Sequence, residues 1–480
     1  MAHYYGFDYG TTTSLLYEFA YGKPNEIARD LSAVGINTDG EITCYGGEAV
    51  FNNHAGVAVE KSPKNFFIID PGHSVNGVDV KTMIRSTLKH FLENQRVNLP
   101  GCHITLTVPN LYTGSQYTEM HALLGEALRE ITGMENGNFN IYFLPEPVAA
   151  ALYYVVCCEK DTFTDRKFVV CDIGGGTTDL TIVSCTRQNR NLTFRVVRNQ
   201  QSNMLGGNDL TSKLASNLGL DEAQMTPTEW NQLDQLKKML SQLPDFAHVI
   251  GRQQVACTRQ RFEGCIQAEL GMLGNLMNGL RDNCGLNVDG NWRLLRVGGT
   301  CRIPAVQRLL QKTFLEIGGQ QTFDAEPLDI FYSVAQGAAI FSAYSAKALK
   351  DAQGNDLYDS ITIESRTPHD IFFQTSGGGW EQIVPQNAPD GTFPVSGLRL
   401  IAPVIVKSKK GDKYKVGQIN LREGNEKMPW PDSENIEFDL CNRRTEDIRV
   451  TLQIEIRNSR MRSCSIVDET TRQEARHEWR

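Results

Sequence analysis

The sequence lacks long apolar runs and metal-binding cysteine patterns. No stretch approaches the roughly 18 to 20 apolar residues that a membrane-spanning helix needs, so we expect no membrane partner. The N-terminus has neither the basic region nor the apolar core of a secretory signal. The 12 cysteines include no Cys-x-x-Cys and no Cys/His cluster with zinc spacing. We therefore expect reduced, mostly buried thiols in a cytoplasmic protein.

An excess of basic residues is also missing. The chain has 48 Lys and Arg against 56 Asp and Glu, a net charge of −8. A nucleic-acid partner normally requires a basic surface, so we expect none. Binding one nucleotide stays open, because it needs only a local arrangement of donors and a cation. The length of 480 residues is enough for two or three domains.

Most of the chain has the pattern of an α/β fold. Residues 1–345 alternate β-type and helical segments with glycine-rich turns between them. Alanine-rich stretches predict helices over 147–158 and 333–345, and apolar spacing predicts another over 229–243. Residues 346–360 are mostly polar, contain a Gly-Asn turn signal and are interpreted as a linker.

The C-terminal part has a different period. Apolar residues recur at every second position in 361–363, 404–406, 436–440 and 450–456, as on the buried face of a strand. Residues 361–480 are therefore predicted to form a small β-rich domain, most simply a sandwich.

One motif occurs twice. A strand-like run near the start ends in Gly6-Phe7-Asp8-Tyr9-Gly10-Thr11-Thr12-Thr13-Ser14. Far downstream, another leads into Asp172-Ile173-Gly174-Gly175-Gly176-Thr177-Thr178-Asp179. Each aspartate ends a strand and precedes a tight turn rich in glycine and threonine. Either motif alone is compatible with an ordinary hairpin turn, but the matching order of the two favours a shared function.

Two such hairpins suit a polyphosphate. Glycines let backbone N–H groups approach phosphate oxygens, and successive N–H groups form an anion nest. Threonine hydroxyls add short donors. An aspartate would repel bare phosphate, so its place beside each turn implies an intervening cation, most simply Mg²⁺ with its waters.

These segments resemble the two phosphate loops of the actin-like ATPase superfamily, and within it the seventy-kilodalton heat-shock (DnaK-type) chaperones. Further stretches resemble that family in the same order, at 144–151, 205–209, 296–304 and 334–339. The resemblance implies an α/β, two-lobed actin-like (ribonuclease H-like) ATPase domain over 1–345, followed by the linker and a small all-β domain over 361–480. Lobe I would cover about 1–166 and lobe II about 167–345.

The resemblance also implies ATP or ADP with Mg²⁺ as cofactors, and it allows K⁺ as a further cation. It gives Asp8 and Asp172 the role of holding Mg²⁺ through water, and Asp179 that of binding cations nearby. The residues implied in nucleotide binding are Asp8, Gly10, Thr11, Thr12, Thr13, Gly174, Gly175, Gly176, Thr177, Gly206, Gly207, Asp234, Lys237, Lys238, Ser241, Gly298, Gly299, Thr300, Arg302 and Ile303.

The catalytic residues implied by the resemblance are Lys64, Glu146, Asp172 and Thr177. Such a lysine neutralises charge that builds on the transferred phosphoryl group. Glu146 would order the attacking water or the metal shell. Lys64 fits the lysine position best and Lys61 is the rival; an ordinary surface lysine is the alternative for each.

The assignment of residues that would bind the nucleoside depends more on the resemblance. Asp234, Lys237, Lys238 and Ser241 have helical spacing and share one face. Without the family, a solvated helix face would be the better interpretation. The family usually has glutamate and often arginine at two of these positions, so the shorter Asp234 and the non-planar Lys238 change how a base and ribose are held.

Other departures concern partners. The family docks J-domain co-chaperones through an arginine and an asparagine, which are Tyr142 and Pro145 here, so that docking is not retained. The leucine-rich interdomain linker is missing. Segments 360–363 and 377–385 resemble the first strands of a substrate-binding β-domain. Only 24 residues follow Ile456, so a short form without the helical lid is expected.

Three functions are weighed. The first is a slow ATPase of the chaperone type, whose nucleotide state controls binding of a polypeptide client or partner by the β-domain, with a co-chaperone or exchange factor. The second is a nucleotide-sensing scaffold or filament-forming actin relative with little turnover. A small-molecule kinase shares the fold, but the C-terminal β-rich region argues against it.

Overall fold

The structure is a computed structural model, and its chain groups into two compact units. One contains Met1–Pro109 and Met120–Thr362, the other Asn110–Glu119 and Ile363–Arg480; each is described by itself. None of the described helices is long and apolar enough to cross a membrane. The described residues are 2–51, 56–94, 99–109, 112, 114–134, 139–159, 162–202, 205–282, 291–316, 332–351, 353–364, 367, 370–374, 379–385, 388, 391–400, 404–408, 411–419, 421–423, 428–429, 436–439, 448–457, 460–472 and 474–478.

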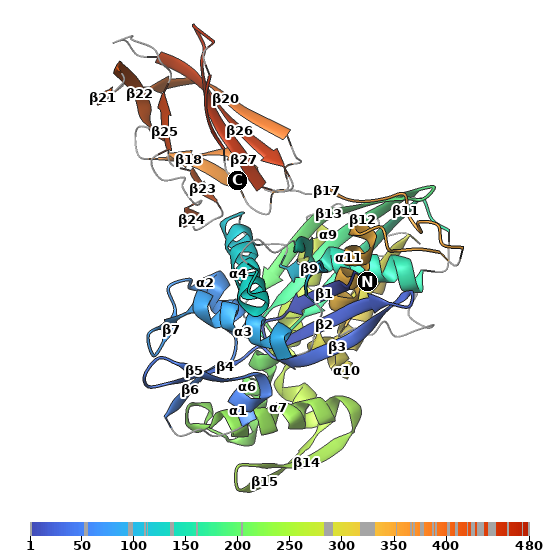
Figure 1. Ribbon diagram of the computed structural model, residues 1–480. Helices are drawn as coiled ribbons and strands as arrows, with labels where there is room; N and C mark the ends of the chain where they lie inside the picture. The colour runs from blue at the N-terminus through green and yellow to red at the C-terminus, as the bar shows by residue number, and fades with distance from the viewer. Residues whose placement is uncertain are drawn as a thin grey trace. The chain divides into compact units, whose positions relative to one another are not determined.

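The first lobe of the first unit is built on a five-stranded sheet with the order β10-β9-β1-β2-β3 (Figure 1). Strands β1, β2 and β3 are antiparallel neighbours, whereas β9 runs parallel to β1 and β10 parallel to β9. The polar end of β1 therefore lies beside the carboxyl end of β9. The strands span Tyr4–Tyr9 (β1), Thr13–Ala20 (β2), Lys23–Leu31 (β3), His103–Val108 (β9) and Asn140–Pro145 (β10).

The second lobe is built on a five-stranded sheet with a similar meander and the order β16-β11-β12-β13-β17; β11, β12, β13 and β17 are labelled in Figure 1. Strands β11, β12 and β13 form the antiparallel meander, and β16 runs parallel to β11. Each copy of the duplicated motif thus joins the first two strands of a meander. The strands span Asp165–Ile173 (β11), Thr178–Gln188 (β12), Asn191–Ser202 (β13), Trp292–Val297 (β16) and Ser360–Glu364 (β17).

The position of β17 corrects one interpretation. We predicted 360–363 as the first strand of the C-terminal β-rich region, but β17 is the edge strand next to β13. The hydroxyl of Ser360 donates to Asn191 (2.6 Å), and the amide of Ile361 donates to the Tyr344 hydroxyl (2.8 Å). The segment 346–360 also makes contacts of its own, including the ion pair Lys350–Asp356 (2.6 Å).

Two apolar helices connect the sheets: α11 packs on β1, β2 and β9 of the first sheet and against α5, which contacts β11 and β12 of the second. Helix α5 spans Glu146–Tyr153 and continues as one π-helical turn over Tyr154–Cys158, and α11 spans Ser333–Ser345. A methyl group at Gly337 of α11 would lie 1.9 Å from the carbonyl oxygen of Ala149 in α5. Only glycine permits this close crossing. Both predicted helices are confirmed, except that the last turn of 147–158 is π-helical.

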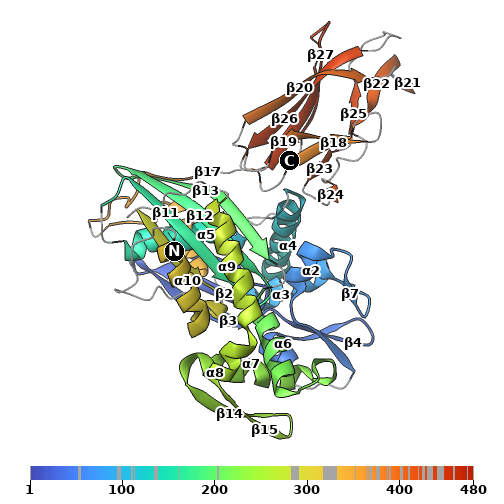
Figure 2. The same cartoon turned by 180° about the vertical axis from the view of Figure 1, so that it is seen from behind.

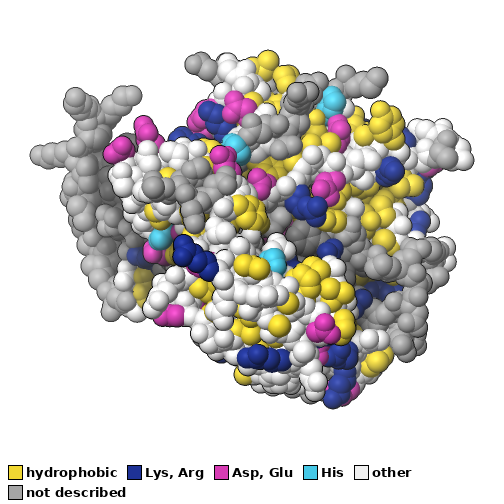
Figure 3. All heavy atoms as spheres, turned by 90° about the horizontal axis from the view of Figure 1, so that it is seen from below, with side chains coloured by type: hydrophobic (Ala, Val, Ile, Leu, Met, Phe, Trp, Pro, Cys, Tyr) yellow, Lys and Arg dark blue, Asp and Glu magenta, His cyan; other side chains and the backbone are white. Residues whose placement is uncertain are grey.

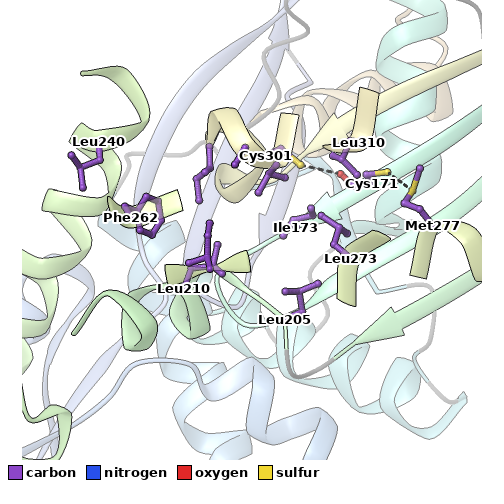
Figure 4. Close-up of a cluster of buried hydrophobic side chains, with 14 of the residues drawn as sticks. Cys171, Ile173, Leu205, Leu210, Leu240, Phe262, Leu273, Met277, Cys301 and Leu310 are labelled. Atoms are coloured by element: carbon purple, nitrogen blue, oxygen red, sulfur yellow. Dashed lines mark hydrogen bonds between the residues drawn. The ribbon is translucent and has the colours of Figure 1, made fainter. Parts of the chain in front are cut away.

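Helix α9 packs on β12 and β13 of the second lobe's sheet, whereas α7 and α8 contact the hairpin of β14 and β15 (Figure 2). Figure 4 shows buried side chains of this lobe, where the thiol of Cys171 lies 3.8 Å from the sulfur of Met277. The predicted helix over 229–243 is α7, and its first turn is fixed by Thr226 and Glu229, which cap each other's backbone N–H. The helices are α6 (Gly207–Leu218), α7 (Pro227–Gln242), α8 (Arg259–Cys265), α9 (Gln267–Asp282) and α10 (Pro304–Glu316), with a hairpin of β14 (Asp245–Ile250) and β15 (Gln253–Thr258).

The remaining part of the first lobe is a layer of short elements that carries Lys64. On the face drawn in Figure 3, the coloured Lys and Arg side chains are interspersed with Asp and Glu. The short elements are β4 (Val34–Asn37), β5 (Ile42–Tyr45), α1 (Gly46–Phe51), β6 (Val57–Glu60), α2 (Pro63–Ile69), β7 (Ser74–Val75) and β8 (Val78–Asp79). The longer helix α3 (Val80–Asn94) follows them, and α4 (Gly114–Thr132) begins within the segment Asn110–Glu119 that belongs to the second unit.

The described residues of the second unit beyond Glu364 are mostly strands. The predicted alternation over 450–456 lies on β26, where Val450, Leu452, Ile454 and Ile456 are fully buried. Three groups of strands pair as β19-β18-β23-β24, β20-β26-β27-β28 and β21-β22-β25. They span Ile371–Gln374 (β18), Trp380–Val384 (β19), Gly391–Leu400 (β20), Val404–Ser408 (β21), Gly411–Ile419 (β22), Leu421–Glu423 (β23), Met428–Pro429 (β24), Ile436–Asp439 (β25), Ile448–Arg457 (β26), Arg460–Asp468 (β27) and Glu474–Glu478 (β28).

Candidate functional site

The two copies of the motif meet in space. The turn between β1 and β2 contacts the turn between β11 and β12. A methyl group at Gly175 would lie 2.0 Å from Thr12 Oγ1, and one at Gly176 would lie 3.0 Å from Thr11 Cγ2. Glycine at these positions therefore lets the two turns approach each other.

The second turn is also held by the start of α6. The amides of Gly207 and Asn208 donate to the carbonyl oxygens of Gly174 (2.9 Å) and Gly175 (2.7 Å). The Thr300 hydroxyl donates to the same Gly174 oxygen (2.9 Å). These bonds fix a glycine turn that has few conformational constraints of its own.

A cavity of about 430 Å³ opens at this junction within the first unit. The predicted site residues line it with two exceptions: Gly176 contacts Thr11, and Gly206 packs against the backbone of Gly175. The predicted residues in the lining are Asp8, Gly10, Thr11, Thr12, Thr13, Lys64, Glu146, Asp172, Gly174, Gly175, Thr177, Asp179, Gly207, Asp234, Lys237, Lys238, Ser241, Gly298, Gly299, Thr300, Arg302 and Ile303.

The ammonium group of Lys64 stands among several carboxylates at the end of the cavity where the two turns meet. Lys64 is 3% exposed and donates from Nζ to Oε1 of Glu146 at 2.7 Å. The hydroxyl of Thr107 donates to Asp8 Oδ1 (2.9 Å), and that of Thr177 donates to Asp179 Oδ2 (3.2 Å).

The electrostatics of this end show an excess of negative charge. Burial, reinforced by Glu146, raises the pKa of Asp8 to about 6 and that of Asp179 to about 7. Burial and the neighbouring carboxylates raise the pKa of Asp172 well above its usual value. Burial opposes the charge on Lys64, yet Glu146 and Asp8 raise its pKa overall. The carboxylates therefore favour an additional cation.

The donor set fits a hydrated cation with phosphate. Among the described residues, no group of three or more His, Cys, Asp and Glu side chains is arranged to hold a metal ion directly. Carboxylates that face a cavity without converging suit a cation held through its waters. Thr12 Oγ1 is buried and has no hydrogen-bond partner in the described part of the chain, so a phosphate oxygen would give this hydroxyl the acceptor it lacks.

The two candidate lysines lie in different places. Lys64 lines the cavity, whereas Lys61 does not and has its ammonium 5.3 Å from the ring centre of Trp230 in α7. Burial lowers the pKa of Lys61. Among these two, Lys64 is the lysine whose ammonium faces the carboxylates.

Two lysines of α7 pair with Asp234, and the Ser241 hydroxyl donates to the Lys237 carbonyl (3.3 Å). Lys237 donates to Asp234 Oδ1 (2.6 Å), to the Gly207 carbonyl (2.6 Å) and to the Thr211 hydroxyl (2.7 Å), which engages all three of its donors. Lys238 donates to Asp234 Oδ2 (2.6 Å). These two lysines outweigh burial and hold the pKa of Asp234 well below its usual value.

Some residues at the cavity were not predicted. Thr107 lies outside the lining and donates to Asp8, and the signal for it is positional: it is the last residue but one of β9, which runs parallel to β1, so the ends of the two strands meet. The residues in the lining that we did not predict are Leu15, Ile68, Pro109, Asn208, Gln235, Met239, Gln242, Val297 and Val334.

Fold and site together fit a two-lobed α/β nucleotide-binding protein of the actin-like class. The model of the Hsp70 protein family matches residues 53–388, and the chain belongs to that family. It is 24% identical to the chaperone protein dnaK1 of Nostoc sp. over 442 residues, 81% of this chain and 60% of the relative. It is 30% identical to a chaperone protein HscA homolog of Acidithiobacillus ferrooxidans over 258 residues, 51% of this chain and 38% of the relative. The chain thus spans less than two thirds of the length of these relatives.

Proposed function

We propose that this protein binds and slowly hydrolyses ATP and that its nucleotide state controls polypeptide binding by the C-terminal β-rich region. One observation carries the proposal. The Lys64–Glu146 pair and three aspartates line a single cavity, at the place where the two glycine-containing turns touch. The names of the relatives, which are chaperone proteins, support it.

The residues have separate roles in this proposal. Backbone N–H groups of the two turns, with the hydroxyls of Thr11, Thr12 and Thr177, bind the β- and γ-phosphates. Lys64 neutralises charge on the transferred phosphoryl group, the largest contribution to this chemistry.

Glu146 orients the attacking water, and its bond to Lys64 fixes the carboxylate while it does so. Asp8, Asp172 and Asp179 hold Mg²⁺ through water. When bound, Mg²⁺ neutralises phosphate charge and orients the phosphate oxygens. K⁺ is the further cation that these carboxylates would accept.

The nucleoside lies against α7 on one side and against Gly298, Gly299, Arg302 and Ile303 on the other. Because Lys237 uses its donors within the protein, it supports this wall, and Lys238 and Ser241 provide the polar contacts to the base.

A polypeptide client or partner protein would bind the β-rich region, with a co-chaperone or exchange factor acting on the ATPase domain. The ATPase domain runs from residue 1 through β17 in this proposal, and the β-rich domain follows. A J-domain would not find its usual contacts, because Tyr142 is half-buried, lies 3.0 Å from His103 through its hydroxyl and packs edge-on against Phe341.

The test is ATP turnover with Mg²⁺ for the wild type, Lys64→Ala and Asp172→Ala. We expect slow turnover in the wild type, and a loss of roughly 10²–10³-fold in kcat for Lys64→Ala. Nucleotide binding by calorimetry should persist in Lys64→Ala and should lose its Mg²⁺ dependence in Asp172→Ala. Binding without any wild-type turnover would refute the ATPase and favour a nucleotide-sensing scaffold or filament-forming relative. A labelled polypeptide whose affinity does not change between ATP and ADP would refute the coupling.

A further inference from the structure

The lysine at the centre of the site lies on a helix that is weakly held by its own bonds. Helix α2 is 7 residues long, Pro63–Ile69, and the side chain of its N-cap residue, Ser62, makes no capping hydrogen bond. A helix this short is not stable through its own hydrogen bonds. The position of Lys64 therefore depends on contacts from outside α2.

One buried carboxylate connects both ends of this helix. Glu60, at the end of β6, is 9% exposed. Its Oε1 accepts the backbone N–H of Ser62 (2.9 Å), just before α2 begins. Its Oε2 lies 3.0 Å from Nε2 of His73, just after α2 ends.

The imidazole of His73 also packs directly against α2. It stacks on Phe66 with ring centres 3.7 Å apart and ring planes 12° from parallel. The His73 backbone continues the connection, because its N–H donates to Asp70 (2.9 Å) and its carbonyl accepts from Val80 at the start of α3 (3.2 Å). The segment that carries Lys64 is thus closed into a loop by Glu60 and His73.

We propose that Glu60 and His73 are positioning residues that hold the Lys64 ammonium against Glu146 and the transferred phosphoryl group. The proposal deepens the function proposed above and, for its effect on turnover, rests on it. Neither residue lines the cavity, so both act through α2. Misplacing a catalytic group by about 1 Å can cost 10²-fold in rate, so a modest shift of α2 should be measurable.

The position of the two residues predicts a specific kinetic pattern. Lys64 meets the end of the phosphate chain, whereas most binding contacts come from the two turns and α7. Losing the Glu60–His73 connection should therefore lower kcat and leave the nucleotide dissociation constant almost unchanged. A residue that only stabilises the fold would not separate the two quantities.

The experiment compares Glu60→Ala, Glu60→Gln and His73→Phe in the full chain. Glutamine can still accept the Ser62 N–H and bond the imidazole, and phenylalanine keeps the stack on Phe66 while losing the bond to Glu60. We expect kcat to fall roughly tenfold in Glu60→Ala and His73→Phe, with a dissociation constant within about twofold of wild type, and Glu60→Gln to restore most of the activity.

The matched control is Glu18→Ala. Glu18 pairs with His3 at 2.6 Å in the same lobe, with its side chain 22% exposed against 11% for Glu60, but lies on β2 outside the cavity lining. Its loss should lower thermal stability and leave kcat unchanged. Equal effects of Glu18→Ala and Glu60→Ala on kcat, or no rescue by Glu60→Gln, would overturn the proposal.

A second readout does not depend on turnover. Lys64 is almost fully buried, so an amine-reactive reagent followed by mass spectrometry should label it slowly in the wild type and several-fold faster in Glu60→Ala and His73→Phe. Faster labelling in a protein that shows no turnover would keep the positioning role and refute the ATPase. Unchanged labelling would overturn the positioning role whatever the turnover.

Discussion

At the scale of single residues, the site contains several partly buried carboxylates with little positive charge beside them. Asp8, Asp172 and Asp179 have raised pKa values for the same first cause, burial, and Glu146 adds to each. Lys64 supplies one ammonium. Such an arrangement costs stability in the nucleotide-free protein, and a bound cation with its phosphates would remove that cost.

The raised pKa of Asp179 predicts how the free energy of unfolding changes with pH. The pKa of Asp179 is about 7 in the folded protein and about 4 when unfolded. The folded state therefore holds the proton more tightly, and this stabilising contribution, present below pH about 4, is lost as the pH rises through about 7. Asn mimics the protonated carboxyl. In EDTA without nucleotide, Asp179→Asn should gain stability over wild type between pH 5 and pH 8, by at most about 4 kcal/mol.

Denaturant unfolding at several pH values measures this difference. The control is Asp39→Asn, which removes a carboxylate from an exposed position outside the cavity. A pH-independent difference for Asp179→Asn would contradict the prediction.

At the scale of elements, the two hairpin turns depend on glycine to different degrees. A methyl group at Gly175 would meet Thr12 Oγ1 at 2.0 Å, whereas one at Gly174 would meet only the Thr177 carbonyl at 3.7 Å, an ordinary contact. We expect Gly175→Ala to lower the free energy of unfolding by about 1–3 kcal/mol, and Gly174→Ala to change it much less.

Urea unfolding of the nucleotide-free variants checks this expectation. Adding Thr12→Gly to Gly175→Ala removes all three atoms that the methyl group would meet and should restore the contact between the turns. If Gly174→Ala and Gly175→Ala are equally destabilised, the turns do not touch as described.

The elements show what the sequence alone could predict. The helices α7 and α11 were predicted in place because their patterns are local: apolar spacing for one, an alanine-rich run for the other. The position of β17 was not predicted. The pattern of 360–363 indicates a strand but not the strand with which it pairs, and its partner, β13, lies far away in the chain. Strand pairing is decided by long-range contacts that a local pattern does not contain.

The candidate site also combines features that the sequence predicts with features that depend on long-range packing. The family resemblance predicted most of the residues that line the cavity, but not Leu15 or Gln235, and two predicted residues, Gly176 and Gly206, are not in the lining. The choice between Lys61 and Lys64 depended on where α2 begins, at Pro63, which directs the two side chains to different neighbours. Helical spacing placed Asp234 and Lys237 on one face, but the bond from Lys237 to Gly207 depends on the packing of α6 against α7.

At the largest scale, the two lobes of the first unit are in contact not only at the touching turns but also at the helix crossing and beside α7. At the helix crossing, α5 and α11 meet with Gly337 against Ala149. Beside α7, Lys61 of the first lobe lies over Trp230 of the second, and the Thr228 hydroxyl donates to the Phe51 carbonyl at 3.4 Å. A nucleotide in the cavity would contact both lobes, so the contacts that Trp230 and Thr228 make with the first lobe should slow its release.

The Lys61–Trp230 contact can be tested against a matched contact within one lobe. Lys167 lies over Trp292 at 5.4 Å, but both belong to the second lobe. A cation–π contact contributes about 1 kcal/mol, so Lys61→Met should speed nucleotide dissociation about fivefold. Lys167→Met should leave it unchanged, because it removes a contact that does not connect the lobes. Stopped-flow release of a fluorescent ATP analogue measures both rates, and equal rates in the two variants would show that the Lys61–Trp230 contact does not restrain opening of the lobes.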